Sequence, residues 1–247
     1  GYAHASVRVC AVSRRDWLRA LRAELGVEYI TRPDNAGAKA GNLNNALAHT
    51  ASRTNAPFIL VLDADFCIQP SLIERVLPLF RDDTIGLVQT PQYFYNPDPI
   101  QHNLGARRTL CDDQRSFFDI LQPSKDAADA AFCVGTSFIV RRAAVEAAGG
   151  FPDGAICEDL NLSYQLYRKG YLTRWLNERL SVGISAESIP EYLTQRTRWC
   201  LGTIQVGLLP DGHFLRPVCP ASSTFGRTAS GSPTVAACRS STRWFKP

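Results

Sequence analysis

The alternation of short apolar runs with amphipathic stretches predicts strands that alternate with helices. Residues 58–62 are five consecutive apolar residues, which is typical of a short strand buried on both faces. Residues 7–12, 27–30 and 86–90 predict further strands. Between the first two of these, residues 16–25 place leucines at helical spacing, so the chain begins with a β-α-β unit. The pattern therefore predicts an α/β fold.

The second half of the chain continues in the same way. Residues 100–120 are polar or charged along much of their surface and predict one long helix. Residues 130–140 are an apolar run interrupted by Gly135, and a glycine within a strand marks a bulge or a close approach by a ligand. Residues 160–169 and 187–202 predict two further helices.

Composition narrows the class of protein. The chain has 247 residues, of which 45% are hydrophobic and 20% charged, as in globular domains large enough to bury a core. Its net charge is +4, from 27 basic and 23 acidic residues, and no basic run is interleaved with aromatic residues. We therefore expect no nucleic acid among its partners.

The eight cysteines form no Cys-x-x-Cys pair and lie at no zinc-finger spacing to the four histidines. Several lie within apolar runs, so we expect free thiols in a reducing compartment. The sequence contains neither 18 uninterrupted apolar residues nor the apolar core of a signal peptide. Because Met is absent even at position 1, we expect an excised or partial piece of a longer protein.

Two carboxylates follow the first apolar run directly. Asp63 and Asp65 lie where the strand predicted for residues 58–62 leaves the sheet, and ligands of open α/β sheets bind beyond the carboxyl ends of the strands. Two acids at positions i and i+2 can share a divalent cation, with diphosphate oxygens completing its shell. The structural alternative is that they cap a helix that begins near Pro70.

Other polar groups are candidate site residues, each with a structural alternative. Lys39 opens a basic, amide-rich run at a predicted helix start, which suits an anion but is also typical of a solvated lysine. Glu158 and Asp159 lie at another predicted helix start. Acidic side chains are stabilised there by the helix dipole, which is the structural alternative; the functional alternative is that one of them is a general base. Residues 195–199 carry two arginines and a tryptophan. In a binding site the arginines would clamp a diphosphate while the indole stacks on a sugar; the structural alternative is an ordinary exposed helix surface. The proline- and aromatic-rich residues 91–99 predict an ordered surface loop or a wall of a carbohydrate or nucleotide cleft.

Six short motifs follow one another along the chain, and their order identifies a protein family more specifically than any single motif does. They are Lys-Ala-Gly-Asn from Lys39, Asp-Ala-Asp from Asp63, Gln-Thr-Pro from Gln89 with Phe-Tyr-Asn-Pro from Phe94, Phe-Cys-Val-Gly-Thr from Phe132, Glu-Asp from Glu158, and Gln-Arg-Thr-Arg-Trp from Gln195. This series resembles the cytoplasmic catalytic domain of the processive family 2 glycosyltransferases, and most closely that of bacterial cellulose synthase catalytic subunits. The resemblance covers residues 7–209 and implies a GT-A fold, which is a Rossmann-like, mostly parallel sheet flanked by helices.

The resemblance also implies a reaction. The family transfers glucose from UDP-glucose to the non-reducing end of a growing β-1,4-glucan, with inversion at the anomeric carbon and with Mg²⁺ or Mn²⁺ as cofactor. By position, Asp63 contacts the nucleotide, Asp65 helps to hold the metal, and Lys39 approaches the diphosphate. The implied partners are the UDP-glucose donor, the β-glucan acceptor and accessory synthase subunits.

The same resemblance assigns roles at the acceptor. Asp159 matches the general base, and Glu158 lies beside it in the motif. Phe132 and Cys133 match the motif that cradles the acceptor end. The residues that match the motif at the diphosphate and the acceptor sugar are Gln195, Arg198 and Trp199.

The chain departs from the family pattern in three places. Residues 11–13 are Ala-Val-Ser where the family has Asp-Asp-Gly, and Cys157 replaces the usual threonine. The family's flanking membrane helices, which place its catalytic domain on the cytoplasmic face of the inner membrane, are absent, so we expect the chain itself to be soluble. Residues 210–247 carry no acidic residue from Gly212 onward and lose all periodicity. We therefore expect a disordered or out-of-frame tail after a catalytic domain at residues 1–209.

Other functions stay open at this point. The missing acids at residues 11 and 12 favour a non-catalytic or inactive nucleotide-sugar-binding fragment as an alternative. Hyaluronan- and chitin-type synthases share much of the motif set, although Gln-Thr-Pro at residues 89–91 favours cellulose. A phosphatase of the strand-Asp-x-Asp type would need threonine or valine where Cys67 stands.

Overall fold

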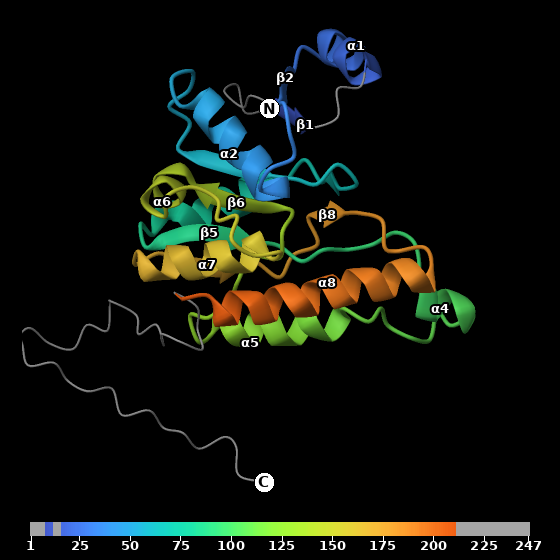
Figure 1. Ribbon diagram of the computed structural model, residues 1–247. Helices are drawn as coiled ribbons and strands as arrows, with labels where there is room; N and C mark the ends of the chain where they lie inside the picture. The colour runs from blue at the N-terminus through green and yellow to red at the C-terminus, as the bar shows by residue number, and fades with distance from the viewer. Residues whose placement is uncertain (1–7, 12–15, 211–247) are drawn as a thin grey trace, which may run out of the picture.

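The computed structural model describes residues 8–11 and 16–210 (Figure 1). The predicted strand at residues 7–12, the predicted domain at residues 1–209, the departure at residues 11–13 and the predicted tail at residues 210–247 therefore fall partly outside the described residues. Of the departure at residues 11–13, Val12 and Ser13 lie outside them, and so do residues 211–247 of the predicted tail.

A four-stranded sheet forms the centre of the described structure, in the order β3-β6-β5-β7. Its strands are β3 (Phe58–Val61), β6 (Phe138–Arg141), β5 (Ile85–Gln89) and β7 (Leu172–Trp175). β5 pairs with β7 in parallel, whereas β6 pairs antiparallel with both β3 and β5. β3, β5 and β7 thus share one direction, and β6 runs against them. The predicted α/β class is confirmed, and the sheet that was predicted to be mostly parallel is a mixed sheet with one parallel and two antiparallel pairings.

Two smaller sheets extend this architecture. β1 (Arg8–Ala11) pairs in parallel with β2 (Glu28–Thr31), and α1 (Asp16–Leu25) connects them, as the β-α-β prediction requires. β4 (Cys67–Ile68) pairs antiparallel with β8 (Ser181–Val182). This second pairing brings the segment that follows Asp65 against a segment more than 100 residues further along the chain.

Helices cover both faces of the central sheet because its strands are apolar on both faces. On one face, Leu87 and Val140 pack with residues of α2 (Ala38–Thr50), α6 (Arg142–Ala147) and α7 (Glu158–Arg168). On the other face, their strand neighbours Val88 and Ile139 pack with α3 (Leu72–Val76) and the 3₁₀ helix η1 (Leu77–Arg81). Alternate side chains of a strand point to opposite faces, so a continuous apolar run is what this layered arrangement requires.

The prediction of one long helix at residues 100–120 is wrong. The structure has α4 (Pro99–Asn103), then turns, a π-helix η2 (Phe117–Leu121) and α5 (Gln122–Asp126). Asp98 starts α4 with a capping box, and the chain leaves it through Gly105, whose left-handed φ of +60° does not continue a helix.

The predicted strand at residues 130–140 is shorter than expected, and the predicted helix at 187–202 is longer. Only Phe138–Arg141 pairs in the sheet, and the preceding residues form a loop in which Gly135 has a φ of +96°. α8 (Ile189–Leu208) lies below the sheet in Figure 1. No helix of the described residues combines the length and hydropathy needed to cross a bilayer. Cys67, Cys111, Cys133, Cys157 and Cys200 are free thiols, as predicted.

Candidate active site

Lys39, Asp63 and the loop around Gly135 meet at one end of the sheet. Lys39 lies in the first turn of α2, which begins after Gly37, and Asp63 follows β3. Lys39 Nζ donates hydrogen bonds to Asp63 Oδ1 at 2.5 Å and to the carbonyl oxygen of Gly135 at 2.6 Å. The backbone N–H of Asp63 donates to Thr136 Oγ1 at 2.9 Å. Three motifs that are far apart in the sequence therefore form one polar cluster.

Asp159 lies next to this cluster, in the first turn of α7. A Cβ atom on Gly135 would lie 3.0 Å from Asp159 Oδ2 and 3.9 Å from Lys39 Nζ, so the glycine leaves the space between the loop and the carboxylate free. Asp159 Oδ1 accepts a hydrogen bond from the backbone N–H of Leu160 at 2.8 Å. Gly135 thus marks a close approach, but the group that approaches is the Asp159 side chain rather than a ligand, and the glycine lies in a loop rather than in a strand.

The environment of Asp159 is suited to proton transfer near neutral pH. Burial raises the pKa of its carboxyl to about 6, and the negative charge of Glu158 adds to this shift. The N–H of Leu160 and the charge of Lys39 act in the opposite direction. A carboxylate with a pKa near the working pH can both take up and release a proton, which is what a general base needs.

A pocket of about 320 Å³ opens beside Asp159, between the start of α7, η2 and α8. Phe132, Cys133 and Trp199, which the sequence assigned to the acceptor, line it together with Asp159. The further lining residues are Gln92, Asp113, Gln114, Phe117, Phe118, Val134, Cys157, Leu160, Arg196 and Thr203. Aromatic rings on several walls and the two carboxylates of Asp113 and Asp159 are side chains that suit a sugar ring and its hydroxyls.

Buried polar side chains hold the loop that forms this wall. Gln89 is fully buried, and its Nε2 donates to the carbonyl oxygens of Thr90 at 2.8 Å and Thr136 at 2.7 Å, while its Oε1 accepts from Val134 N at 2.9 Å. Gln92 Nε2 donates to Val134 O at 2.7 Å. The Gln-Thr-Pro motif is therefore a scaffold for the pocket wall as well as a family marker.

Sequence reasoning missed Ser163, which accepts a hydrogen bond from Cys133 N at 2.8 Å and is buried. It also missed Asp113 and Gln114, because the prediction of a long helix gave no reason to bring that segment to α8. For the scaffolding role of Gln89 and Thr90 a usable signal was present in the sequence. Both end an otherwise apolar run, and polar side chains that are buried with such a run need hydrogen-bond partners.

The predicted diphosphate clamp is only partly assembled. Trp199 lines the pocket, but Gln195 and Arg198 are not among its lining residues. Gln195 Oε1 accepts from the neighbouring Arg196 at 3.3 Å, and Arg198 is exposed. Arg198 lies close enough to Cys157 to lower the pKa of its thiol, which burial and the charges of Asp159 and Glu158 together raise to about 11.

The predicted metal site is not a closed protein site. Across the described ranges, no group of three or more His, Cys, Asp or Glu side chains is placed to hold a metal ion. Asp63 already accepts from Lys39, and Asp65 is exposed. Two carboxylates one residue apart fit a hard cation only where other oxygens, such as those of a diphosphate, complete its shell.

The proline- and aromatic-rich segment lines a second, more polar pocket of about 380 Å³. Tyr93, Phe94, Asn96 and Pro97 contribute to it, as the prediction of a cleft wall proposed. Its other lining residues are Gln92, Asp98, Gln101, Arg107, Arg108, Thr109, Leu110, Cys111, Asp112, Asp113, Arg115, Arg179 and Ser185. Gln92 and Asp113 line both pockets.

Comparison with known proteins identifies the family of the chain. Residues 58–240 match the model of the family described as Glycosyl transferase family group 2. The chain is 34% identical over 199 residues to the cellulose synthase catalytic subunit [UDP-forming] of Xanthomonas axonopodis pv. citri, covering 80% of this chain and 27% of that protein. It is 37% identical over 194 residues to the cellulose synthase 1 catalytic subunit of Komagataeibacter xylinus, covering 78% and 26%. The chain thus spans about a quarter of the length of these relatives.

The fold has a solved counterpart. The mannosyltransferase PcManGT from Pyrobaculum calidifontis, in complex with GDP-Man and Mn²⁺, superposes with a TM-score of 0.56 at 19% identity, over 81% of this chain and 53% of that chain. At this identity the likeness concerns the fold, which is of the GT-A type. With a family match over most of its length, the chain belongs to the glycosyltransferase group 2 family, and bacterial cellulose synthases are among its relatives.

Proposed function

We propose that this chain transfers glucose from UDP-glucose to the non-reducing end of a growing β-1,4-glucan, with inversion at the anomeric carbon. The observation that carries the proposal is the position of Asp159. Its carboxyl, with a pKa of about 6, lines a pocket walled by Phe132 and Trp199 and faces the Lys39–Asp63 pair across Gly135. A base between an aromatic pocket and the Lys39–Asp63 ion pair, whose lysine can bind a diphosphate, matches what glycosyl transfer requires.

The chemical step follows from this arrangement. The terminal sugar of the acceptor stacks in the pocket on Trp199, and its hydroxyl proton passes to the Asp159 carboxylate. The hydroxyl oxygen forms a bond to the anomeric carbon as the bond from that carbon to the diphosphate oxygen breaks. UDP leaves with the bonding electron pair, and attack from the opposite face inverts the anomeric carbon.

The donor side needs positive charge for the departing UDP. Lys39 supplies one charge at the cluster, and we assign Gln195 and Arg198 to the diphosphate on their motif. Asp65, together with Asp63, would hold Mg²⁺ or Mn²⁺, whose chemistry is to neutralise charge on the diphosphate. The Mn²⁺ and GDP-Man bound by the mannosyltransferase of the same fold support this assignment.

The cellular setting belongs to the same proposal. Because the chain spans about a quarter of its cellulose synthase relatives, we propose that it acts as the cytoplasmic catalytic part of a synthase held in the inner membrane by flanking helices. Accessory synthase subunits would accompany such an enzyme.

Calorimetric titration of UDP into the 247-residue chain, with Mn²⁺ or Mg²⁺ and again with EDTA, tests the donor site. We expect metal-dependent binding that Asp65→Asn abolishes, and release of UDP from UDP-glucose in the presence of cello-oligosaccharides that Asp159→Asn abolishes. Preference for UDP-N-acetylglucosamine would instead point to a hyaluronan- or chitin-type synthase.

A non-catalytic nucleotide-sugar-binding domain is the second candidate, favoured by Ala11 and Val12 in place of two acids. It predicts weak UDP affinity and no turnover. Restoring Asp at residues 11 and 12 and Gly at 13 separates the two candidates, because gain of turnover on restoration would show that the missing acids alone had silenced the enzyme.

A further inference from the structure

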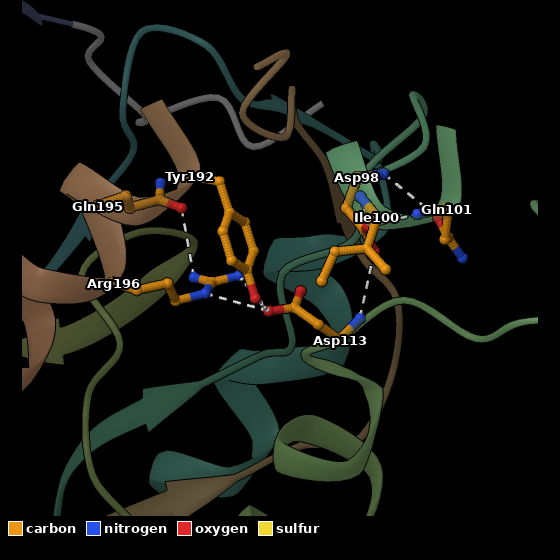
Figure 2. A network of polar contacts seen from close by, with 7 residues as sticks. All are labelled: Asp98, Ile100, Gln101, Asp113, Tyr192, Gln195 and Arg196. Carbon is orange, nitrogen blue, oxygen red and sulfur yellow. Dashed lines mark hydrogen bonds and ion pairs between the residues drawn. The ribbon is translucent and has the colours of Figure 1, made fainter. Parts of the chain in front are cut away.

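Asp113 and Arg196 form an ion pair (Figure 2), in which Asp113 lines both pockets and Arg196 lines the pocket beside Asp159. Asp113 Oδ2 accepts hydrogen bonds from Arg196 Nη2 at 2.6 Å and Nε at 3.1 Å, and from the hydroxyl of Tyr192 at 2.8 Å. Both charged side chains are about three-quarters buried. One carboxylate oxygen therefore fixes two side chains that lie one turn apart on α8.

The backbone at Asp113 is itself anchored. Its N–H donates to Asp98 Oδ2 at 3.3 Å, and Asp98 is 3% exposed. The other oxygen of Asp98 caps α4 by accepting from the backbone N–H groups of Ile100 and Gln101, as the dashed lines in Figure 2 show. A carboxylate held in this way is a rigid reference point rather than a mobile surface group.

The ion pair reaches the sugar pocket through aromatic contacts. The guanidinium carbon of Arg196 lies 4.4 Å from the ring centroid of Trp199 and 4.7 Å from that of Tyr192. A guanidinium over an indole face is attracted by the electrons of the ring, and it can stack flat on that face. Trp199, Arg196 and Asp113 all line the pocket that contains Asp159.

We propose that Asp113 is a positioning residue: by fixing Arg196 it holds the Trp199 indole in the orientation that forms the sugar-binding wall. The sugar-binding part of this inference rests on the proposed function, whereas the positioning of Trp199 does not depend on any ligand. Asp113 itself need not touch the sugar, and its effect passes through the guanidinium.

The first test measures the orientation of Trp199 without a ligand. The chain contains four tryptophans, so 5-fluorotryptophan labelling gives resolvable ¹⁹F resonances, and Trp199→Phe identifies the one from Trp199. We expect Asp113→Asn to shift or broaden that resonance and Asp113→Glu, which keeps the charge, to restore it in part. The matched control is Glu178→Gln, which removes the charge from the ion pair of Glu178 with Arg75 and should leave the Trp199 resonance unmoved.

The second test measures ligand affinity by calorimetry, with cellotetraose and UDP as the probes. We expect Asp113→Asn to weaken cellotetraose binding about fivefold to tenfold and to leave UDP binding within about twofold, because the pair contacts Trp199 directly and the proposed diphosphate site only through the 3.3 Å hydrogen bond from Arg196 to Gln195. An unchanged Trp199 resonance in folded Asp113→Asn overturns the inference, whatever the affinities are. Failure of the proposed function gives a different result: the wild-type chain then binds no cellotetraose, while the resonance still reports whether Asp113 positions Trp199.

Discussion

Lys39 Nζ lies 2.5 Å from Asp63 Oδ1, although 24 residues separate them in the sequence, and it also contacts the carbonyl oxygen of Gly135, 96 residues away. One ammonium group thus ties together the first turn of α2, the end of β3 and the loop before β6. Both side chains of the pair keep between 30% and 40% of their surface exposed, so the pair remains accessible to a ligand. We therefore expect the Lys39–Asp63 pair to contribute more to ligand affinity than to the free energy of unfolding.

Replacing Lys39 by methionine tests this expectation. The substitution keeps the aliphatic stem and removes the charge, so we expect UDP affinity to fall about tenfold, equivalent to about 1.4 kcal/mol. The free energy of unfolding should change by less than about 1 kcal/mol, because the ion pair is partly exposed. Calorimetry and denaturant titration measure the two quantities. Lys169→Met, at the exposed end of α7, is the control and should alter neither.

Asp159→Asn should stabilise the folded chain in a pH-dependent way. The native pKa of about 6 exceeds the ordinary value of 3.8, so between these values the native state binds more protons than the unfolded state, and wild-type stability falls as pH rises. Asparagine does not ionise, so the stability of the variant does not fall with pH for this reason. Its advantage should be near zero at pH 4 and reach about 1–3 kcal/mol at pH 7.

Denaturant titration of both proteins across this range measures the difference. A constant difference at every pH would contradict the raised pKa. In the proposed reaction the base must be deprotonated, so the rate of transfer by the wild type should fall as pH drops through about 6.

Gly135→Ala should lower stability and displace Asp159. The residue has a φ of +96°, and the added methyl carbon would lie 3.0 Å from Asp159 Oδ2. We expect a loss of about 1–3 kcal/mol and a shift of the Asp159 titration seen by carboxyl NMR. Gly105→Ala is a matched control, because Gly105 also has a positive φ, +60°, but nothing lies within 4 Å of its added carbon. It should be destabilised by backbone strain and leave the Asp159 titration unchanged.

Gln89→Leu should remove the support of the pocket wall. The substitution leaves the N–H of Val134 and the carbonyl oxygens of Thr90 and Thr136 without their buried partner. Unpaired buried groups of this kind cost about 1–3 kcal/mol each, so we expect a loss of about 3 kcal/mol or more, together with weaker cello-oligosaccharide binding.

Gln69→Leu provides the comparison for Gln89→Leu. Gln69 also donates to a carbonyl oxygen, that of Arg179, but it is exposed, so its loss should change stability by no more than about 0.5 kcal/mol. Equal losses in the two variants would show that the buried amide has no special role.

The sequence alone determined the elements with strong local signals and the family to which the chain belongs. Five consecutive apolar residues at 58–62 contain β3, and residues 16–25 form α1 as predicted, because burial and leucine spacing are local properties. The order of the motifs identified the family, which the family match confirms, and pointed to Asp159 and Trp199, which line one pocket.

Only the tertiary structure decided how these residues are supported. The break of residues 100–120 into α4, η2 and α5 depends on Asp98, whose two oxygens bond to groups on both sides of a turn, and no periodicity reveals this. The scaffolding roles of Gln89 and Ser163, and the pairing of Asp113 with Arg196 across 83 residues, arise from contacts between distant segments. Such contacts form because buried polar groups must find partners wherever the packed elements place them, a condition that the whole fold sets.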